Sequence, residues 1–287
     1  MRAIPQKCLS LVGLILTSAP VLMAQSLPFG LQNQPAVSKD AVSTDSDLSN
    51  FTGQYSFAVQ GALVGKDIIS RKVGIVGSLV SDGKGHIISG VEDYNSEIGT
   101  FPALPITGTY TLNAAGVGTL TLKSSQMTQT FSFFAPQVPG RVQNATLTES
   151  DGLAGVTGSI DKQIAATSLD GGYNFSLTGQ TVETSGLPNP VALGGNFVAT
   201  TGNVLGSTTF FVGEAQMGGA VVLPATPFQA TITAPDSNGR LAFTVIFAPN
   251  GQPAHFVGYA LDPTHINFLT LDRASEFLPL LTGQAVR

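Results

Sequence analysis

Three histidines, His86, His255 and His265, could act as general bases or as metal ligands. His255 precedes and His265 follows a turn at Asp262-Pro263-Thr264, so a hairpin would hold the two rings roughly 20 Å apart, too far to share one ion. Across this hairpin His255 could hydrogen-bond to Asp272, and His265 could bond to Asp262 within the turn. Because no serine or cysteine nucleophile stands beside either pair, the sequence predicts no catalytic residue and no metal site.

Acidic residues form a second candidate group. Glu92 and Asp93 end an expected strand, and Glu214 is the corresponding acid in the second half of the chain. Carboxylates gathered at the mouth of a barrel could serve acid–base chemistry or bind a cation. The alternative is that they are solvated loop acids. Glu92, Asp93 and Glu214 are therefore predicted as a possible acidic mouth group.

Aromatic residues offer a third kind of site, an apolar pocket. Tyr55, Phe57, Tyr173 and Phe175 are the candidate ligand-binding residues, because they open the two halves of the chain on one strand face. The alternative is a core that these rings simply fill. The full set of aromatic residues expected to point inward is Tyr55, Phe57, Phe131, Phe133, Tyr173, Phe175, Phe243, Phe247, Phe256 and Tyr259.

The elements that must position these residues are repeated. The stretch Gly53-Gln54-Tyr55-Ser56-Phe57-Ala58-Val59-Gln60-Gly61 returns as Gly171-Gly172-Tyr173-Asn174-Phe175-Ser176-Leu177-Thr178-Gly179. Apolar and small residues alternate in both copies, which is typical of a strand with one buried face. Further matches follow in the same order, down to Thr157-Gly158 and Thr282-Gly283. The sequence therefore predicts two tandem domains of about 115 residues each.

Short apolar runs between turn signals, without a 3.6-residue stripe, predict an all-β chain. Two tandem antiparallel meander barrels, of about eight strands each, would pair every strand edge, and β-sandwiches are the alternative. The short polar linker at 164–168 suggests that the two domains fold independently. The expected division is a signal peptide (1–24), a flexible leader (25–47), a first barrel repeat (48–163) and a second barrel repeat (167–287).

Individual strands can be placed by the same pattern. In the second repeat Leu241–Phe247 is the clearest strand, Val182–Val191 reads as a loop, and Gly213–Pro227 is either a strand or a cap on the barrel. In the first repeat the expected strands are Gln54–Gln60, Lys72–Ser81, His86–Asp93, Gly108–Asn113, Gly118–Lys123, Gln129–Ala135, Arg141–Glu149 and Val156–Lys162.

The Leu/Phe-x-Gly-x-Tyr-x-Phe opening, followed by an antiparallel meander, resembles the start of avidin-type and lipocalin-type barrels. It also resembles secreted bacterial proteins of uncharacterised function that carry this repeat in tandem. The likeness covers the opening strand and the overall plan. Avidin and lipocalin barrels usually place a tryptophan where Tyr55 and Tyr173 stand, and this chain has no tryptophan, so no ligand residue carries over.

Composition excludes several classes of function. Only 11% of residues are charged and the net charge is −5, so the basic stripe that nucleic-acid binding needs is missing. Arg2 and Lys7 followed by the apolar run 8–16 predict an export signal cut after Ala24. The only cysteine, Cys8, lies within that signal, so no disulfide would support the domains. No membrane span is expected after cleavage, and no cofactor.

The sequence thus predicts a secreted, non-enzymatic structural or interaction protein of the bacterial envelope or exterior, located in the periplasm or outside the cell. The alternative is a carrier that binds a small neutral apolar or aromatic ligand in its barrels, and a third hypothesis is a barrel isomerase or lyase. The expected partner is an unknown protein or a small neutral ligand. A cavity inside a barrel would favour the carrier, and convergent charged side chains inside it would favour the enzyme.

Overall fold

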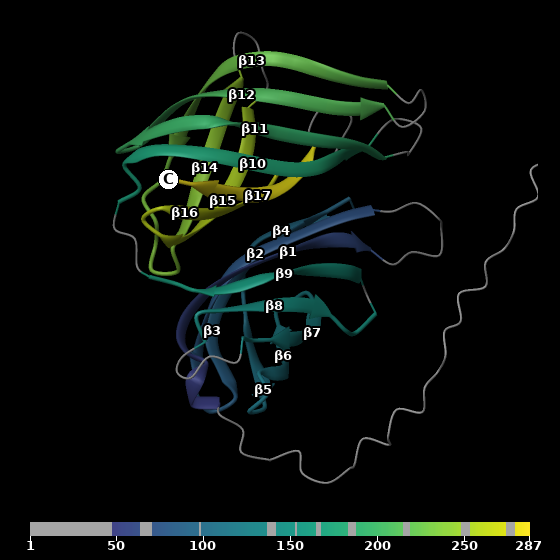
Figure 1. Ribbon diagram of the computed structural model, residues 1–287, viewed down its shortest axis with the longest axis vertical. Coiled ribbons are helices and arrows are strands. Elements are labelled where there is room, and N and C mark those ends of the chain that lie inside the picture. Colours follow the sequence, from purple (N-terminus) through teal and green to yellow (C-terminus); the bar gives the residue numbers. More distant parts are fainter. Residues whose placement is uncertain are drawn as a thin grey trace, which may run out of the picture. The chain divides into compact units, whose positions relative to one another are not determined.

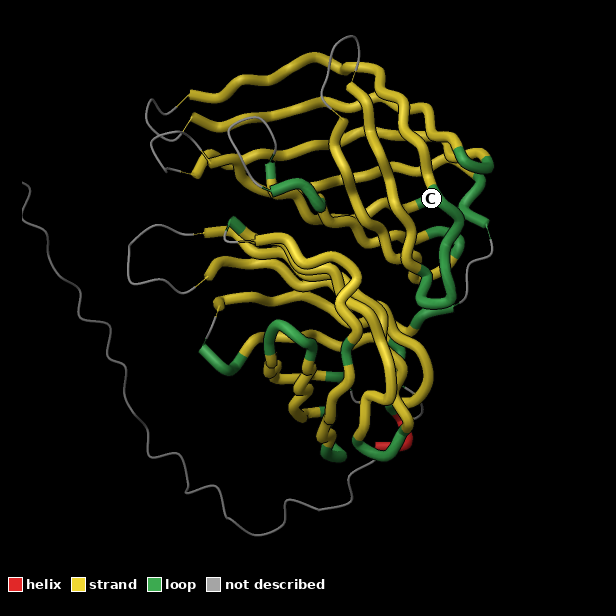
Figure 2. Tube along the Cα trace, turned by 180° about the vertical axis from the view of Figure 1, so that it is seen from behind, coloured by secondary structure: helices red, strands yellow, loops and turns green. Residues whose placement is uncertain are grey.

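The computed structural model describes most of the chain from residue 48 onward (Figures 1 and 2). The expected signal peptide (1–24) and leader (25–47) lie outside the described residues. Those residues are 48–63, 71–97, 99–136, 142–152, 154–164, 168–182, 188–214, 219–247, 253–273 and 279–287. Apart from the short 3-10 turn η1 (Leu48–Asn50), every regular element among them is a β-strand. The all-β prediction is confirmed.

The first half of the chain forms a closed antiparallel barrel. Its strands follow the order β2-β1-β9-β8-β7-β6-β5-β3, and a further pairing of β3 with β2 closes the ring. The prediction of a barrel, with a sandwich as its alternative, is therefore confirmed for this half. The strands of this half are β1 (Thr52–Leu63), β2 (Arg71–Asp82), β3 (His86–Ser96), β4 (Gly99–Pro105), β5 (Thr107–Leu112), β6 (Val117–Lys123), β7 (Thr128–Phe134), β8 (Asn144–Glu149) and β9 (Ala154–Lys162).

Strand β4 has no counterpart in the sequence prediction. It runs along the later part of β3, where Ser96 pairs with Gly99 and Val91 with Pro105. Among the described strands it pairs with β3 alone, and an edge position is where proline, which cannot donate to the ladder, is tolerated. The two prolines of β4, Pro102 and Pro105, are the reason that this segment reads as a loop.

The second half forms another closed antiparallel barrel, in which β10 to β17 pair in chain order and β17 returns to β10. The expected loop at 182–191 is wrong for residues 188–191, because Pro188 begins a strand, a position that needs no ladder donor. Residues 219–227 belong to a strand, as one of the two alternatives predicted. The strands are β10 (Gly171–Val182), β11 (Pro188–Thr200), β12 (Asn203–Glu214), β13 (Gly219–Ile232), β14 (Arg240–Phe247), β15 (Pro253–Asp262), β16 (His265–Thr270) and β17 (Leu280–Val286).

The first two strands of each barrel pair in the same register. Phe57 of β1 pairs with Gly77 of β2, and Phe175 of β10 pairs with Gly195 of β11. A Cβ added at Gly77 would lie 2.5 Å from the Phe57 ring, and one at Gly195 would lie 2.9 Å from the Phe175 ring. The matching glycines therefore make room for the phenylalanine rings that cross them.

One end of the first barrel is filled by aromatic rings. Phe51 lies before β1, and its ring centroid is 4.2 Å from that of Tyr55, 4.9 Å from Tyr110 and 5.0 Å from Phe133. The Tyr55 hydroxyl donates a 3.0 Å hydrogen bond to the Val142 carbonyl, which satisfies its polar end. This end of the barrel is closed.

The two barrels belong to one compact unit. An apolar cluster joins Val76 of the first barrel to Val257, Tyr259, Leu269 and Leu280 of the second. The residues of this cluster lie on outward faces of strands and not in the linker. The composition of the linker therefore could not predict that the two barrels pack together.

Candidate functional site

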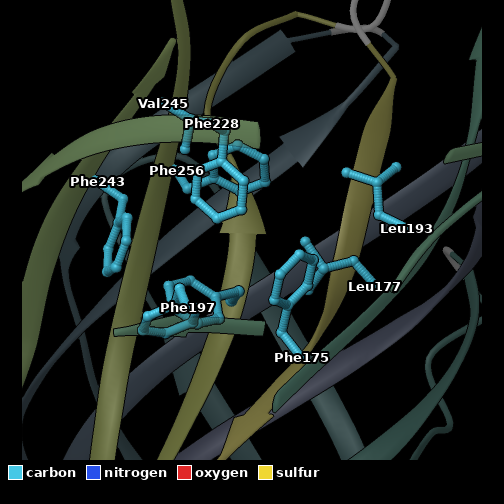
Figure 3. Close-up of a pocket in the computed structure, with 9 residues that line it drawn as sticks. Phe175, Leu177, Leu193, Phe197, Phe228, Phe243, Val245 and Phe256 are labelled. Atoms are coloured by element: carbon cyan, nitrogen blue, oxygen red, sulfur yellow. The ribbon is translucent and has the colours of Figure 1, made fainter. Parts of the chain in front are cut away.

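A cavity lies inside the second barrel, and its lining is entirely apolar (Figure 3). Its volume is about 40 Å³. The lining residues come from six of the eight strands: Phe175 and Leu177 (β10), Leu193 and Phe197 (β11), Phe228 (β13), Phe243 and Val245 (β14), Phe256 (β15) and Phe268 (β16).

Alternation along the strands aims these side chains inward. Phe175 and Leu177 are two residues apart on β10, and so are Phe243 and Val245 on β14. Successive side chains of a strand point to opposite faces, so residues two apart share a face. The alternation that forms the cavity is thus present in the sequence, and Phe175, Phe243 and Phe256 of its lining are among the residues predicted to point inward.

The rings of the cavity pack mainly edge to face. Phe175 lies 6.1 Å from Phe228 at 80°, Phe197 lies 5.8 Å from Phe243 at 69°, and Phe243 lies 5.2 Å from Phe268 at 87°. Aromatic pairs prefer this geometry because the ring edge is positive and the face negative. Of the nine lining residues, Phe175 alone is half-buried, and the other eight are buried. Phe175 is therefore the lining ring most open to displacement.

The other three candidate ligand-binding residues serve as core. Tyr55 and Phe57 are fully buried and belong to the apolar core of the first barrel. Tyr173 is buried in the second barrel, where its ring stacks on Phe197 at 5.0 Å and its hydroxyl donates to the Pro263 carbonyl at 2.7 Å. Phe175 is the candidate that reaches the cavity.

The remaining inward aromatic predictions have mixed outcomes. Phe131 and Phe133 are in the core of the first barrel. The prediction that Tyr259 points inward is wrong. Tyr259 lies three residues after Phe256 and therefore on the opposite face of β15, in the cluster between the barrels. The side chain of Phe247 lies outside the described part.

The structure separates the predicted acidic group. Asp93, fully buried, points out of the first barrel and accepts two 2.8 Å hydrogen bonds from the Arg240 guanidinium. The Tyr259 hydroxyl donates to it at 2.6 Å. Burial, followed by the charge of Asp93, raises the pKa of Tyr259 well above its usual value. Asp93 thus joins the two barrels, and is no mouth acid.

Glu92 points the other way, into the first barrel, and is 1% exposed. Burial raises the pKa of its carboxyl to about 7, and the adjacent charge of Asp93 adds to this. Glu214 ends β12, and its side chain lies outside the described part. The register places Thr208 opposite Gly195, as Glu92 is opposite Gly77, so Thr208 holds the place of Glu92 in the second barrel.

Two further polar residues inside the first barrel were absent from the sequence candidates. Gln129 begins β7 on the face that carries Phe131 and Phe133, and Glu149 ends β8 on the face that carries Leu147. Strand alternation was the signal that could have found both.

His255 and His265 lie beside the carboxylates that the sequence indicated, and His86 lies beside Asp82, a contact that was not predicted. His255 Nδ1 lies 2.9 Å from Asp272 Oδ1, and His265 Nδ1 lies 3.2 Å from Asp262 Oδ2. His86 Nδ1 lies 2.9 Å from Asp82 Oδ2. In the described residues no group of three or more His, Cys, Asp or Glu side chains is placed to hold a metal ion.

Comparison of the chain with models of known protein families and with curated proteins found no match. Over the residues that the structure describes, no helix has the length and apolar character needed to cross a membrane.

Proposed function

We propose that the chain is a non-enzymatic binding protein whose second barrel holds a small neutral apolar molecule. The observation that supports this is the cavity lined by nine apolar side chains. A charged or sugar-like ligand would lose its hydration there without gaining a polar partner, which costs several kcal/mol. The chemistry of the lining therefore selects neutral, apolar ligands.

The size of the cavity limits what it can hold. Its volume of about 40 Å³ is well below the roughly 150 Å³ of an apolar cavity known to admit benzene or xenon. A monatomic or very small apolar guest needs the least rearrangement. A ring-sized guest needs displacement of Phe175, the half-buried lining residue.

The test is a titration of the full chain with xenon, followed by ¹²⁹Xe NMR, and with benzene, followed by calorimetry. Binding is expected to be saturable and to show a negative heat-capacity change, the mark of apolar burial. Leu193→Phe places a ring in the cavity and should abolish xenon binding. Phe228→Leu enlarges the cavity and should strengthen benzene binding.

Ile75→Phe is the matched control, because Ile75 faces Val59 in the first barrel as Leu193 faces Leu177 in the second. It should leave xenon binding unchanged. The proposal is wrong if neither probe binds below about millimolar, or if Leu193→Phe and wild type bind xenon equally while both stay folded by circular dichroism.

A structural or interaction role is the second candidate, and a different observation favours it. The first barrel has a core of packed apolar side chains, and the buried Asp93–Arg240 pair fixes it to the second barrel. Such a pair would hold two modules at a constant spacing. A chain that binds no apolar probe, yet unfolds in a single cooperative transition that Arg240→Ala splits into two, would support this role.

A further inference from the structure

Three buried oxygen atoms inside the first barrel have no hydrogen-bond partner in the described structure. They are Glu92 Oε2, Gln129 Oε1 and Glu149 Oε2. Glu92 is 1% exposed and Gln129 is 4% exposed. Buried acceptors are almost always satisfied in native proteins, so these three take their donors from outside the chain, from water or from a ligand.

The strand directions bring these three residues to the same end of the barrel. Glu92 lies in the second half of β3, Glu149 ends β8, and Gln129 lies at the start of β7, which runs antiparallel to β8. The Phe51 ring cluster closes the opposite end. Glu149 is half-buried, whereas Glu92 and Gln129 are buried, so Glu149 is the member of the group nearest to solvent.

Neighbouring groups tie the three residues together. Burial raises the pKa of Tyr94, and the charges of Glu149 and Glu92 raise it further, so Tyr94 lies within electrostatic reach of both carboxyls. The nearby Ser124 hydroxyl holds the pKa of the Glu92 carboxyl down against the effect of burial. The Gln129 amide donates to the Met127 sulfur at 2.9 Å.

No cation balances the two carboxyls in the part of the chain that the structure describes, where neither Glu92 nor Glu149 forms an ion pair. The other titratable groups beside them are Tyr94, Asp93 and Asp151. Burial and the neighbouring Asp151 raise the pKa of Glu149 to about 8. All of these groups are acids, so the site favours a positive guest.

The Gln129 oxygen is an acceptor, and the two carboxyl oxygens are acceptors once Glu92 and Glu149 are ionised, so an organic ammonium matches the group. A primary ammonium carries three N–H donors that can satisfy oxygens of this group, and the ring of Tyr94, which lies within electrostatic reach of both carboxyls, can add a cation–π contact. Calcium would need six to eight oxygen ligands, more than this group supplies. We propose that the polar end of the first barrel binds the ammonium group of a small primary amine.

Binding of an ammonium ion requires ionised carboxylates. With pKa values raised to about 7 and about 8, Glu92 and Glu149 keep part of their protons near neutral pH, so the amine must displace protons when it binds. Affinity for the amine should therefore rise from pH 6 to pH 8, over which both carboxyls ionise while the amine stays charged.

The test is calorimetry of the full chain with butylammonium chloride at pH 7.5, repeated in two buffers of different ionisation heat. Saturable binding below about 1 mM is expected, with proton release revealed by the difference between the buffers. Glu92→Gln and Gln129→Leu each remove one acceptor at nearly constant volume, and each should weaken binding at least tenfold. Tetramethylammonium, which has no N–H donor, should bind at least tenfold more weakly.

Glu97→Gln is the matched control, because Glu97 follows the same strand but bonds to Gln180 of the second barrel; it should change affinity by less than twofold. The proposal is overturned if butylammonium does not saturate, if tetramethylammonium binds equally well, or if calcium alone binds and is lost in Glu92→Gln. Should both site variants fail to fold, an absence of proton release by wild type would still overturn it.

Discussion

Replacing Glu92 with glutamine is expected to flatten the pH dependence of stability between pH 5 and pH 8. The carboxyl has an ordinary pKa of 4.5, and burial raises this to about 7 in the folded chain. The folded state therefore keeps a proton that the unfolded state has already lost. Stability from this group is greatest at low pH and is lost as the pH rises towards 7.

The magnitude follows from the two pKa values. Each unit of pKa difference is worth about 1.4 kcal/mol, so wild type should lose roughly 2 to 3 kcal/mol of unfolding free energy through Glu92 between pH 5 and pH 8. Glutamine does not ionise, and the variant should lose that much less over the same range. Other acids, such as Glu149, contribute to both chains alike and cancel in the comparison.

The assay is urea denaturation followed by circular dichroism at pH 5, 6, 7 and 8 for wild type, Glu92→Gln and Glu97→Gln. The Glu97→Gln profile should stay closer to wild type, because the Glu97 carboxyl has Gln180 and Arg71 as partners. Equal slopes in wild type and Glu92→Gln would refute the reasoning, since they would mean that Glu92 ionises freely in the folded barrel.

Three further outcomes are expected. Tyr55→Ala and Tyr173→Ala should each cost about 3–5 kcal/mol in urea denaturation, because both rings are buried; losses below about 0.5 kcal/mol at both sites would contradict the core role of these rings. Arg240→Ala should cost about 3–5 kcal/mol because it strands the buried Asp93 charge, and an Asp93→Asn background should reduce that cost, whereas an unchanged cost would show that the pair is not coupled. Residues 168–287 alone should fold, but with a lower thermal midpoint than the full chain, because the apolar side chains that pack against the first barrel become exposed. An unchanged midpoint would show that the interface does not contribute to the stability of the second barrel.

Local alternation carried most of the strand prediction. Tyr55, Phe57 and Val59 define a buried face within a few residues, and the repeat at Tyr173 confirms it. Strand β4 was not predicted, because its two prolines are typical of a loop. Its pairing along β3 alone explains how a strand can contain them. Closure is non-local, since it depends on β3 meeting β2 and β17 meeting β10. The barrel could be preferred over the sandwich only because it leaves no exposed edges.

The sites were harder to predict, because alternation does not say what covers an outward face. Asp93 and Glu92 are adjacent, so they had to point apart, but the sequence could not reveal that Arg240 and Tyr259 would meet Asp93 from the other barrel. Glu149 follows the inward pattern of Leu147, yet its relation to Glu92 arises only when the barrel closes. Which side chains meet inside a barrel depends on how the strands are ordered around it. The sequence of a single strand does not give that order.

The pairing of β10 with β17 has a kinetic consequence. Asn174 pairs with Val286 and Leu177 with Gly283, so every other strand of the second barrel lies between the partners in the chain. The hairpins of this barrel can form early from neighbouring segments, whereas its closure must wait for the most distant pair, and such non-local pairing slows folding. Until then β10 presents an unpaired edge that another chain could occupy. Refolding should therefore become less efficient as protein concentration rises, and the partner most able to capture the open barrel is the β17 segment of a second copy.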